Sequence, residues 1–151
     1  MKKTIVSILT MIMLSLCMSS CGSKAKGDSI DLTNFIVPIS WKMTRQEIIN
    51  RDGTPDENND NTIHYYNRDF SGYKGEYIYG FDDNNNLQFL KFSFDQEDDA
   101  NSYFSYLRNL YGDGKTWNYG EFWYGTVNGE EATLVSVFKA NIVEVDKGHD
   151  L

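Results

Sequence analysis

Apolar residues at helical spacing occur twice along the chain, and alternating apolar and polar residues follow each time. The first helical stretch lies within residues 41–55. Thr44 and Glu47 there have the spacing of a capping box, which satisfies the free amides at the start of a helix. Gly53 and Pro55 would end this helix after about two turns. The pattern predicts a short helix near the start of the folded domain.

The second helical stretch follows the acidic cluster at 95–99 and would end at Gly112. Its apolar residues recur at three- and four-residue spacing, which predicts one buried face. The residues of that face are Ala100, Tyr103, Phe104, Leu107, Leu110 and Tyr111.

Alternating patterns predict strands after both helices. The expected strands are 62–68, 76–82 and 87–94 after the first helix, then 117–127, 132–139 and, as a further candidate, 141–145. Ser71-Gly72, the polar loop 82–86 and Asn128-Gly129 have turn residues, and the last is the strongest hairpin signal. Residues 31–40 are apolar but contain Pro38, which favours an extended segment packed on the domain.

The two halves of the chain match in pattern, because residues 48–53 align with residues 107–112 at an offset of 59 positions. We interpret the fold class as α+β, with two tandem helix-then-antiparallel-strands units in one compact domain at 31–146. Unit one covers about 41–95 and unit two about 96–146, and residues 147–151 form a tail. Chance similarity between two ordinary helix-to-strand transitions is the alternative.

Residues 1–20 have the features of an export signal. Lys2 and Lys3 precede an apolar run at 5–18 that is too short to span a bilayer. The run ends in small residues directly before Cys21, which resembles the lipobox of bacterial lipoproteins, whose cysteine is lipid-modified and becomes the first residue after cleavage. We expect a lipoprotein signal peptide at 1–20 and a flexible tether at 21–30. An ordinary secretory signal with an incidental thiol is the alternative.

The charge and the scarcity of metal-binding residues exclude several classes of function. Without Lys2 and Lys3 the chain has 12 basic and 22 acidic residues, so nucleic acid is not an expected partner. His64 and His149 are the only histidines, and we expect His64 to be structural. The acidic loops at 56–60 and 82–86 begin like calcium-binding loops but lack the required glycine and glutamate. We therefore expect no metal, no cofactor and no enzymatic activity, although a pair of facing carboxylates would leave no mark in a sequence.

Aromatic residues are dense between positions 117 and 124. On one continuous strand, Trp117, Tyr119 and Trp123 would share one face, and Phe122 and Tyr124 the other. Both faces cannot line the same core, so one set would be exposed and could bind a protein or stack on a sugar. The candidate binding residues are Trp117, Tyr119, Trp123 and Tyr124. The alternative is that residues 31–40 or the neighbouring unit cover the second face.

The motifs Met43-Thr44-Arg45-Gln46-Glu47-Ile48, Asp52-Gly53-Thr54-Pro55 and Tyr65-Tyr66 together resemble a known signature. It is similar to that of the small outer-membrane lipoproteins of the SmpA/OmlA type and of the wider group with beta-lactamase inhibitor protein, which has two such units in tandem. The likeness covers about thirty residues well and the second half in outline. Lys42 and Asp52 depart from it. The resemblance implies a non-enzymatic module that binds other proteins through its sheet and loops.

Together these features predict a lipoprotein of the bacterial cell envelope, anchored by a lipid on Cys21 to the outer membrane or the cell surface. Its expected role is to bind a protein partner. The alternative is a glycan-binding module that uses exposed aromatic residues.

Overall fold

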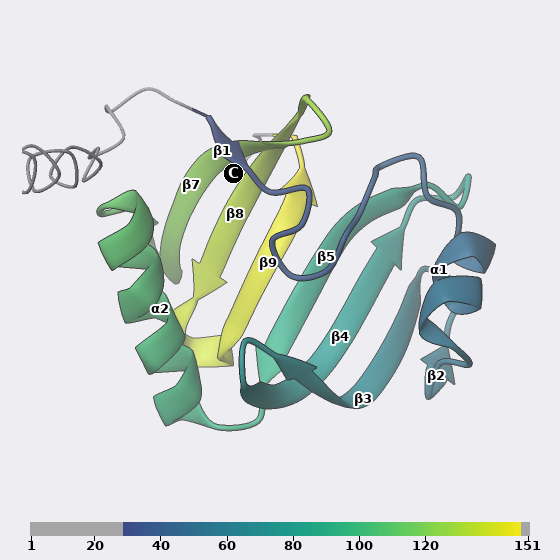
Figure 1. Cartoon of the computed structure of the whole chain (residues 1–151), viewed down its shortest axis with the longest axis horizontal. Helices are drawn as coiled ribbons and strands as arrows, with labels where there is room; N and C mark the ends of the chain where they lie inside the picture. Colours follow the sequence, from purple (N-terminus) through teal and green to yellow (C-terminus); the bar gives the residue numbers. More distant parts are fainter. Residues whose placement is uncertain (1–28, 149–151) are drawn as a thin grey trace, which may run out of the picture.

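The computed structural model describes residues 29–148. The signal peptide, Cys21, the tether up to residue 28, and residues 149–151 with His149 lie outside the described residues. The described part is an α+β fold that consists mostly of one mixed, nine-stranded sheet (Figure 1). The predicted fold class is confirmed at this level.

The sheet has the strand order β1-β7-β8-β9-β5-β4-β3-β2, and β6 pairs with β7 on the same edge as β1. Only the β1–β7 pair is parallel. The strands are β1 (Ile30–Asp31), β2 (Glu57–Asn58), β3 (Thr62–Phe70), β4 (Tyr73–Phe81), β5 (Leu87–Phe94), β6 (Lys115–Trp117), β7 (Gly120–Val127), β8 (Glu130–Val137) and β9 (Ile142–Lys147). The helices are α1 (Arg45–Asp52), α2 (Glu97–Tyr111) and the short 3-10 helix η1 (Phe138–Ala140).

Helix α1 begins and ends where its local signals predict. The Thr44 hydroxyl accepts a hydrogen bond from the Glu47 amide, and the Thr44 amide donates to Glu47 Oε2 at 2.7 Å. This completes the capping box. Gly53 follows the helix with a φ of 92°, a conformation that favours glycine. The predicted helix of about two turns is confirmed with eight residues.

Both helices lie on the same face of the sheet (Figure 1). Tyr65 of β3 donates to the Gly53 carbonyl at the end of α1, and Trp123 of β7 donates to the Gly112 carbonyl at the end of α2. Their strands therefore point these side chains toward the helices. Phe92, Leu90, Val145 and Leu134 are fully or almost fully buried on this face, which contains the core.

Residues 32–43, the lead-in segment, cross the helix-covered face between α1 and α2 (Figure 1). Leu32, Ile36, Ile39 and Trp41 are buried in the core. The Asn128 side chain donates to the Ile39 carbonyl at 3.1 Å and ties the segment to the β7–β8 turn. The prediction that this segment packs on the domain without forming a helix is confirmed, but a turn at Thr33 and Asn34 and bends at 35–37 replace the expected extended conformation.

Three local predictions need correction. Residues 117–127 do not form one strand, because a turn at Asn118 and Tyr119 separates β6 from β7. Leu110 is half exposed instead of buried, because it lies at the margin of the helical stripe whose centre is Phe104 and Leu107. The segment 56–60, expected to be a loop, contains the two-residue strand β2.

Neither α1 nor α2 is both long enough and apolar enough to cross a membrane.

Candidate functional site

The face of the sheet opposite α1 and α2, here called the open face, is the main candidate site. Its side chains alternate with core residues along the strands, although in β8 the open-face residues Thr133 and Val135 are themselves buried. In β5, Leu90, Phe92 and Phe94 are buried, whereas Phe89, Lys91 and Ser93 are only partly covered. In β9, Val143 and Val145 are buried, and the residues that alternate with them, Ile142, Glu144 and Asp146, are partly exposed. No described helix covers this face (Figure 1).

The strand register aligns the open-face residues in rows across the sheet. One row runs Gly80, Phe89, Asp146, Thr133 and Tyr124 from β4 to β7. The next row runs Ile78, Lys91, Glu144, Val135, Phe122 and Lys115. Charged residues therefore occupy the middle of the open face, and aromatic residues lie on both sides of them.

Glu144 and Lys91 form an ion pair at the centre of the open face, with 3.0 Å between Lys91 Nζ and Glu144 Oε2. Both side chains are mostly covered, which limits screening by solvent. Lys91 Nζ also lies 4.6 Å from the centre of the Phe89 ring, a cation–π arrangement. The Lys91 ammonium group is thus held by both the Glu144 carboxylate and the Phe89 ring.

Asp146 is the second acid at the centre and lies two residues after Glu144 on the same face of β9. Burial, then the charge and hydrogen bond of Glu144, raise the pKa of Asp146 to about 8, although Lys91 opposes the shift. The two carboxyl groups share a hydrogen bond. They are therefore too close for glycoside hydrolysis, which needs a separation of at least about 5 Å.

Aromatic residues lie at the β6–β7 end of the open face. The strand pairing puts Trp117, Phe122 and Tyr124 on this face. Lys115 Nζ lies 4.3 Å from the centre of the Tyr124 ring, and the Phe122 and Tyr124 rings are 5.5 Å apart. Trp117 is 38% exposed and Tyr124 is 40% exposed. Tyr119 lies in the turn beside Trp117 and is 55% exposed.

Trp123 does not belong to this exposed group. It is 6% exposed, lies on the helix-covered face and donates its Nε1 hydrogen to the Gly112 carbonyl at 3.0 Å. The turn after Trp117 changes the alternation, so Trp117 shares a face with Phe122 and not with Trp123. The predicted grouping of Trp117, Tyr119 and Trp123 on one face is therefore wrong. Three of the four predicted binding residues are exposed.

Lys91, Glu144 and Asp146 were not among the predicted site residues. Lys91 and Glu144 lie between apolar neighbours and Asp146 follows Val145, so all three are at positions that alternate with core residues. Charged residues at these positions indicate the face that is not buried. Their meeting across β5 and β9 depends on a pairing between strands about fifty residues apart, which no local pattern predicts.

A hydroxyl, an imidazole and a carboxylate lie in line on the open face, in β3 and β4. Thr62 Oγ1 is 3.0 Å from His64 Nε2, and His64 Nδ1 is 2.5 Å from Glu76 Oε1. This order resembles a nucleophile, base and acid. However, Thr62 lies in a regular β3–β4 ladder, and the next amide across, that of Phe81, donates to the Asn61 carbonyl. The backbone here is engaged in the sheet and forms no oxyanion hole, so we interpret this set as a bridge between strands.

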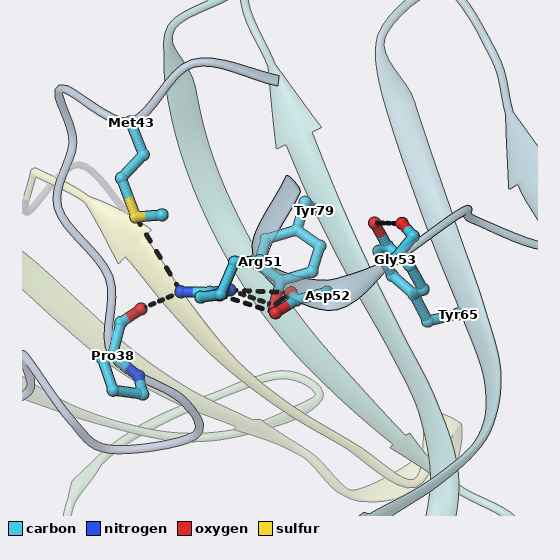
Figure 2. Close-up of polar contacts among 7 residues, drawn as sticks. All are labelled: Pro38, Met43, Arg51, Asp52, Gly53, Tyr65 and Tyr79. Carbon is cyan, nitrogen blue, oxygen red and sulfur yellow. Dashed lines mark hydrogen bonds and ion pairs between the residues drawn. The ribbon is translucent and has the colours of Figure 1, made fainter. Parts of the chain in front are cut away.

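A second polar cluster joins the end of α1 to the lead-in segment and β4 (Figure 2). The Arg51 guanidinium donates to the Pro38 carbonyl, to Asp52 and to the Tyr79 hydroxyl. Tyr79 in turn donates to Asp52 Oδ2 at 2.7 Å. Burial and then this hydrogen bond raise the pKa of Tyr79 far above its usual value, so the phenol remains a donor. Every member has a partner within the chain, which indicates a structural role.

Among residues 29–148 there is no group of three or more His, Cys, Asp or Glu side chains arranged to hold a metal ion. Asp82 in the β4–β5 loop instead accepts hydrogen bonds from the amides of Asn84 and Asn86, both at 2.9 Å. This contact lowers the pKa of Asp82 and fixes the turn.

Comparisons with protein-family models, curated proteins and solved structures find no match.

Proposed function

We propose that the protein is a non-enzymatic lipoprotein of the bacterial cell envelope that binds a protein partner through the open face of its sheet. A lipid on Cys21 would hold it at the outer membrane or cell surface. The single observation that supports the binding role best is the pair of exposed aromatic residues Trp117 and Tyr124, with the partly covered Phe122, beside the charged centre of the open face. Tryptophan and tyrosine are the residues that most often dominate binding energy at protein interfaces.

We also propose that the fold is a tandem of two units like that of beta-lactamase inhibitor protein. The element order supports this, since α1 precedes β3, β4 and β5, and α2 precedes β6, β7, β8 and β9. The last strands of the two sets, β5 and β9, pair with each other at the centre of the sheet. The open face would then be one continuous binding surface to which both units contribute.

The binding role can be tested by affinity capture from detergent-solubilised envelopes, with quantitative mass spectrometry of the retained proteins. We expect a protein that is retained by the unchanged chain and lost when Trp117→Ser and Tyr124→Ser are combined. Tyr106→Ser is the matched control, because Tyr106 is similarly exposed but belongs to α2, which lies on the opposite face of the sheet. Equal retention by all three chains, or no specific protein, would contradict the proposal.

The anchor is tested separately. We expect intact-mass analysis of the membrane-extracted protein to detect a chain that starts at Cys21 and carries lipid. Cys21→Ser should move the protein to the soluble fraction. An unmodified thiol on a soluble mature chain would support the ordinary secretory signal instead.

Glycan binding is a second candidate, because Trp117 and Tyr119 are both exposed and adjacent. Their ring centres are 5.2 Å apart, but the rings meet at 76°, so they do not form one flat platform for a sugar. This geometry favours the protein partner. Binding on a glycan array that is lost with Trp117→Ser would reverse the preference.

A further inference from the structure

Helix α2 has two half-exposed apolar residues that the core does not explain. Tyr106 is 51% exposed and Leu110 is 49% exposed, and their spacing of four residues makes them neighbours on the helix surface. The Tyr106 ring lies 5.7 Å from that of Tyr103, which lies 6.4 Å from Phe35 of the lead-in segment. Tyr106 and Leu110 are here called the α2 surface. This surface is exposed to solvent and adjoins the packed aromatic residues Tyr103 and Phe35.

The end of α2 lies close to the start of the described chain. Trp123 of β7 donates to the carbonyl of Gly112, directly after α2. Ile30 of β1 pairs with Gly125, two residues further along β7. Two residues of a strand span about 7 Å. Figure 1 accordingly has β1 and the last turn of α2 on the same side of the molecule.

The chain length before β1 limits how far this side can be from a membrane anchor. Ile30 is nine residue steps after Cys21, and a fully extended chain of that length spans at most about 30 Å. A lipid on Cys21 would therefore keep the end of α2 near the bilayer surface. A contact of low intrinsic affinity can form under these conditions, because the tether raises the local concentration.

The charges of α2 are distributed in agreement with this orientation. Glu97, Asp98 and Asp99 are in its first turn, at the far end of a helix about 22 Å long. From Ala100 onward Arg108 is the only charged residue, and it is paired with Glu121 at 2.8 Å. The half of α2 nearest the anchor thus presents apolar and uncharged polar groups. Tyrosine suits the boundary between lipid headgroups and acyl chains, because its ring is apolar and its hydroxyl is polar.

We propose that the α2 surface rests in the headgroup region of the bilayer that holds the lipid on Cys21. The helix-covered side of the domain then faces the membrane, and the open face points away from it toward a partner. This inference rests on the lipid anchor of the proposed function.

The test uses the chain that starts at Cys21, whose thiol is then the only one. It is coupled to a maleimide lipid in phosphatidylcholine vesicles and compared with the same chain after the thiol is blocked. Hydroxyl-radical footprinting reports the exposure of each side chain. We expect oxidation of Tyr106 and Leu110 to fall severalfold on the vesicles, whereas oxidation of Tyr66 at the other side of the sheet stays the same. Equal change at all three residues would overturn the proposal.

A variant provides the second arm. The half-buried Tyr111 lies beside the α2 surface and should also be protected on vesicles. Tyr106→Ser combined with Leu110→Ser should abolish this protection, and Tyr66→Ser should preserve it. Protection of Tyr111 that persists in the double variant would contradict the proposal. The vesicles contain no partner protein and the lipid is attached chemically. A negative footprinting result would therefore contradict the membrane contact of α2 without contradicting partner binding through Trp117 and Tyr124. A negative capture result would likewise not contradict the membrane contact.

Discussion

The ring of Phe89 lies directly over Gly80 on the open face of the sheet. A Cβ atom added to Gly80 would come within 2.0 Å of the Phe89 ring, far closer than van der Waals contact. Glycine at this position therefore leaves room for the Phe89 ring beside β4, where Lys91 Nζ packs on the ring. The absence of a side chain at Gly80 thus determines where the Phe89 ring lies, and the ring in turn contacts Lys91 of the charged centre.

We expect Gly80→Ala to displace the Phe89 ring and to destabilise the protein by about 1–3 kcal/mol, the usual range for overpacking. Urea unfolding measures this cost. Phe89→Ala combined with Gly80→Ala should cost less than the sum of the two single changes, because the ring that clashes is gone. Additive costs would show that the added methyl group disturbs the backbone instead.

The Arg51 cluster should hold the lead-in segment against the domain. Arg51→Ala removes the hydrogen bonds to Pro38, Asp52 and Tyr79, so we expect a loss of about 1–3 kcal/mol. Hydrogen exchange should become faster in residues 32–43. The Lys74–Asp69 pair is the control, because both side chains are more than half exposed and Lys74→Ala should cost less than about 1 kcal/mol. Equal costs would contradict the role of Arg51.

Asp146 should make stability depend on pH. Its pKa is raised from 3.8 to about 8 by burial and by Glu144, so the folded protein holds this proton more tightly than the unfolded chain does. Stability contributed by Asp146 is therefore lost as pH rises from about 4 to about 8. Asp146→Asn should match the unchanged protein near pH 4 and exceed its stability by about 1–3 kcal/mol at pH 9. Urea unfolding across this range measures the difference.

The exposed Asp83 in the β4–β5 loop is the matched control for this experiment. Asp83→Asn should leave the pH dependence unchanged. If Asp146→Asn gives the same difference at pH 4 and pH 9, the carboxyl group of Asp146 does not bind its proton as the structure indicates.

Features that depend on a few neighbouring residues could be predicted from the sequence. The capping box of Thr44 and Glu47, the stop at Gly53 and the turn at Asn128-Gly129 are all present. Asn128 and Gly129 have φ values of 51° and 81°, as the predicted tight turn requires. These signals succeed because their energies arise within a few residues of chain.

The composition of the open face could not be predicted in the same way. Asp146 and Phe89 meet because β9 pairs with β5, and a shift of β9 by one residue would turn Asp146 into the core while Phe89 stayed on the open face. The grouping of the aromatic residues failed for a smaller reason: the turn at Asn118 and Tyr119 interrupts the alternation. Because the prediction assumed one uninterrupted strand, it placed Trp123 among the binding residues, although Trp123 is buried.

Trp123 and Tyr124 should therefore differ sharply when they are replaced, although they are adjacent in sequence. Trp123→Ala removes a buried indole and its hydrogen bond to Gly112, so we expect a loss of about 3–5 kcal/mol. Tyr124→Ala removes a ring that is 40% exposed and should cost much less, while it weakens partner capture. Urea unfolding and the capture assay measure the two effects. If Tyr124→Ala destabilises as much as Trp123→Ala, the ring is part of the core, and the binding surface would have to lie elsewhere on the open face.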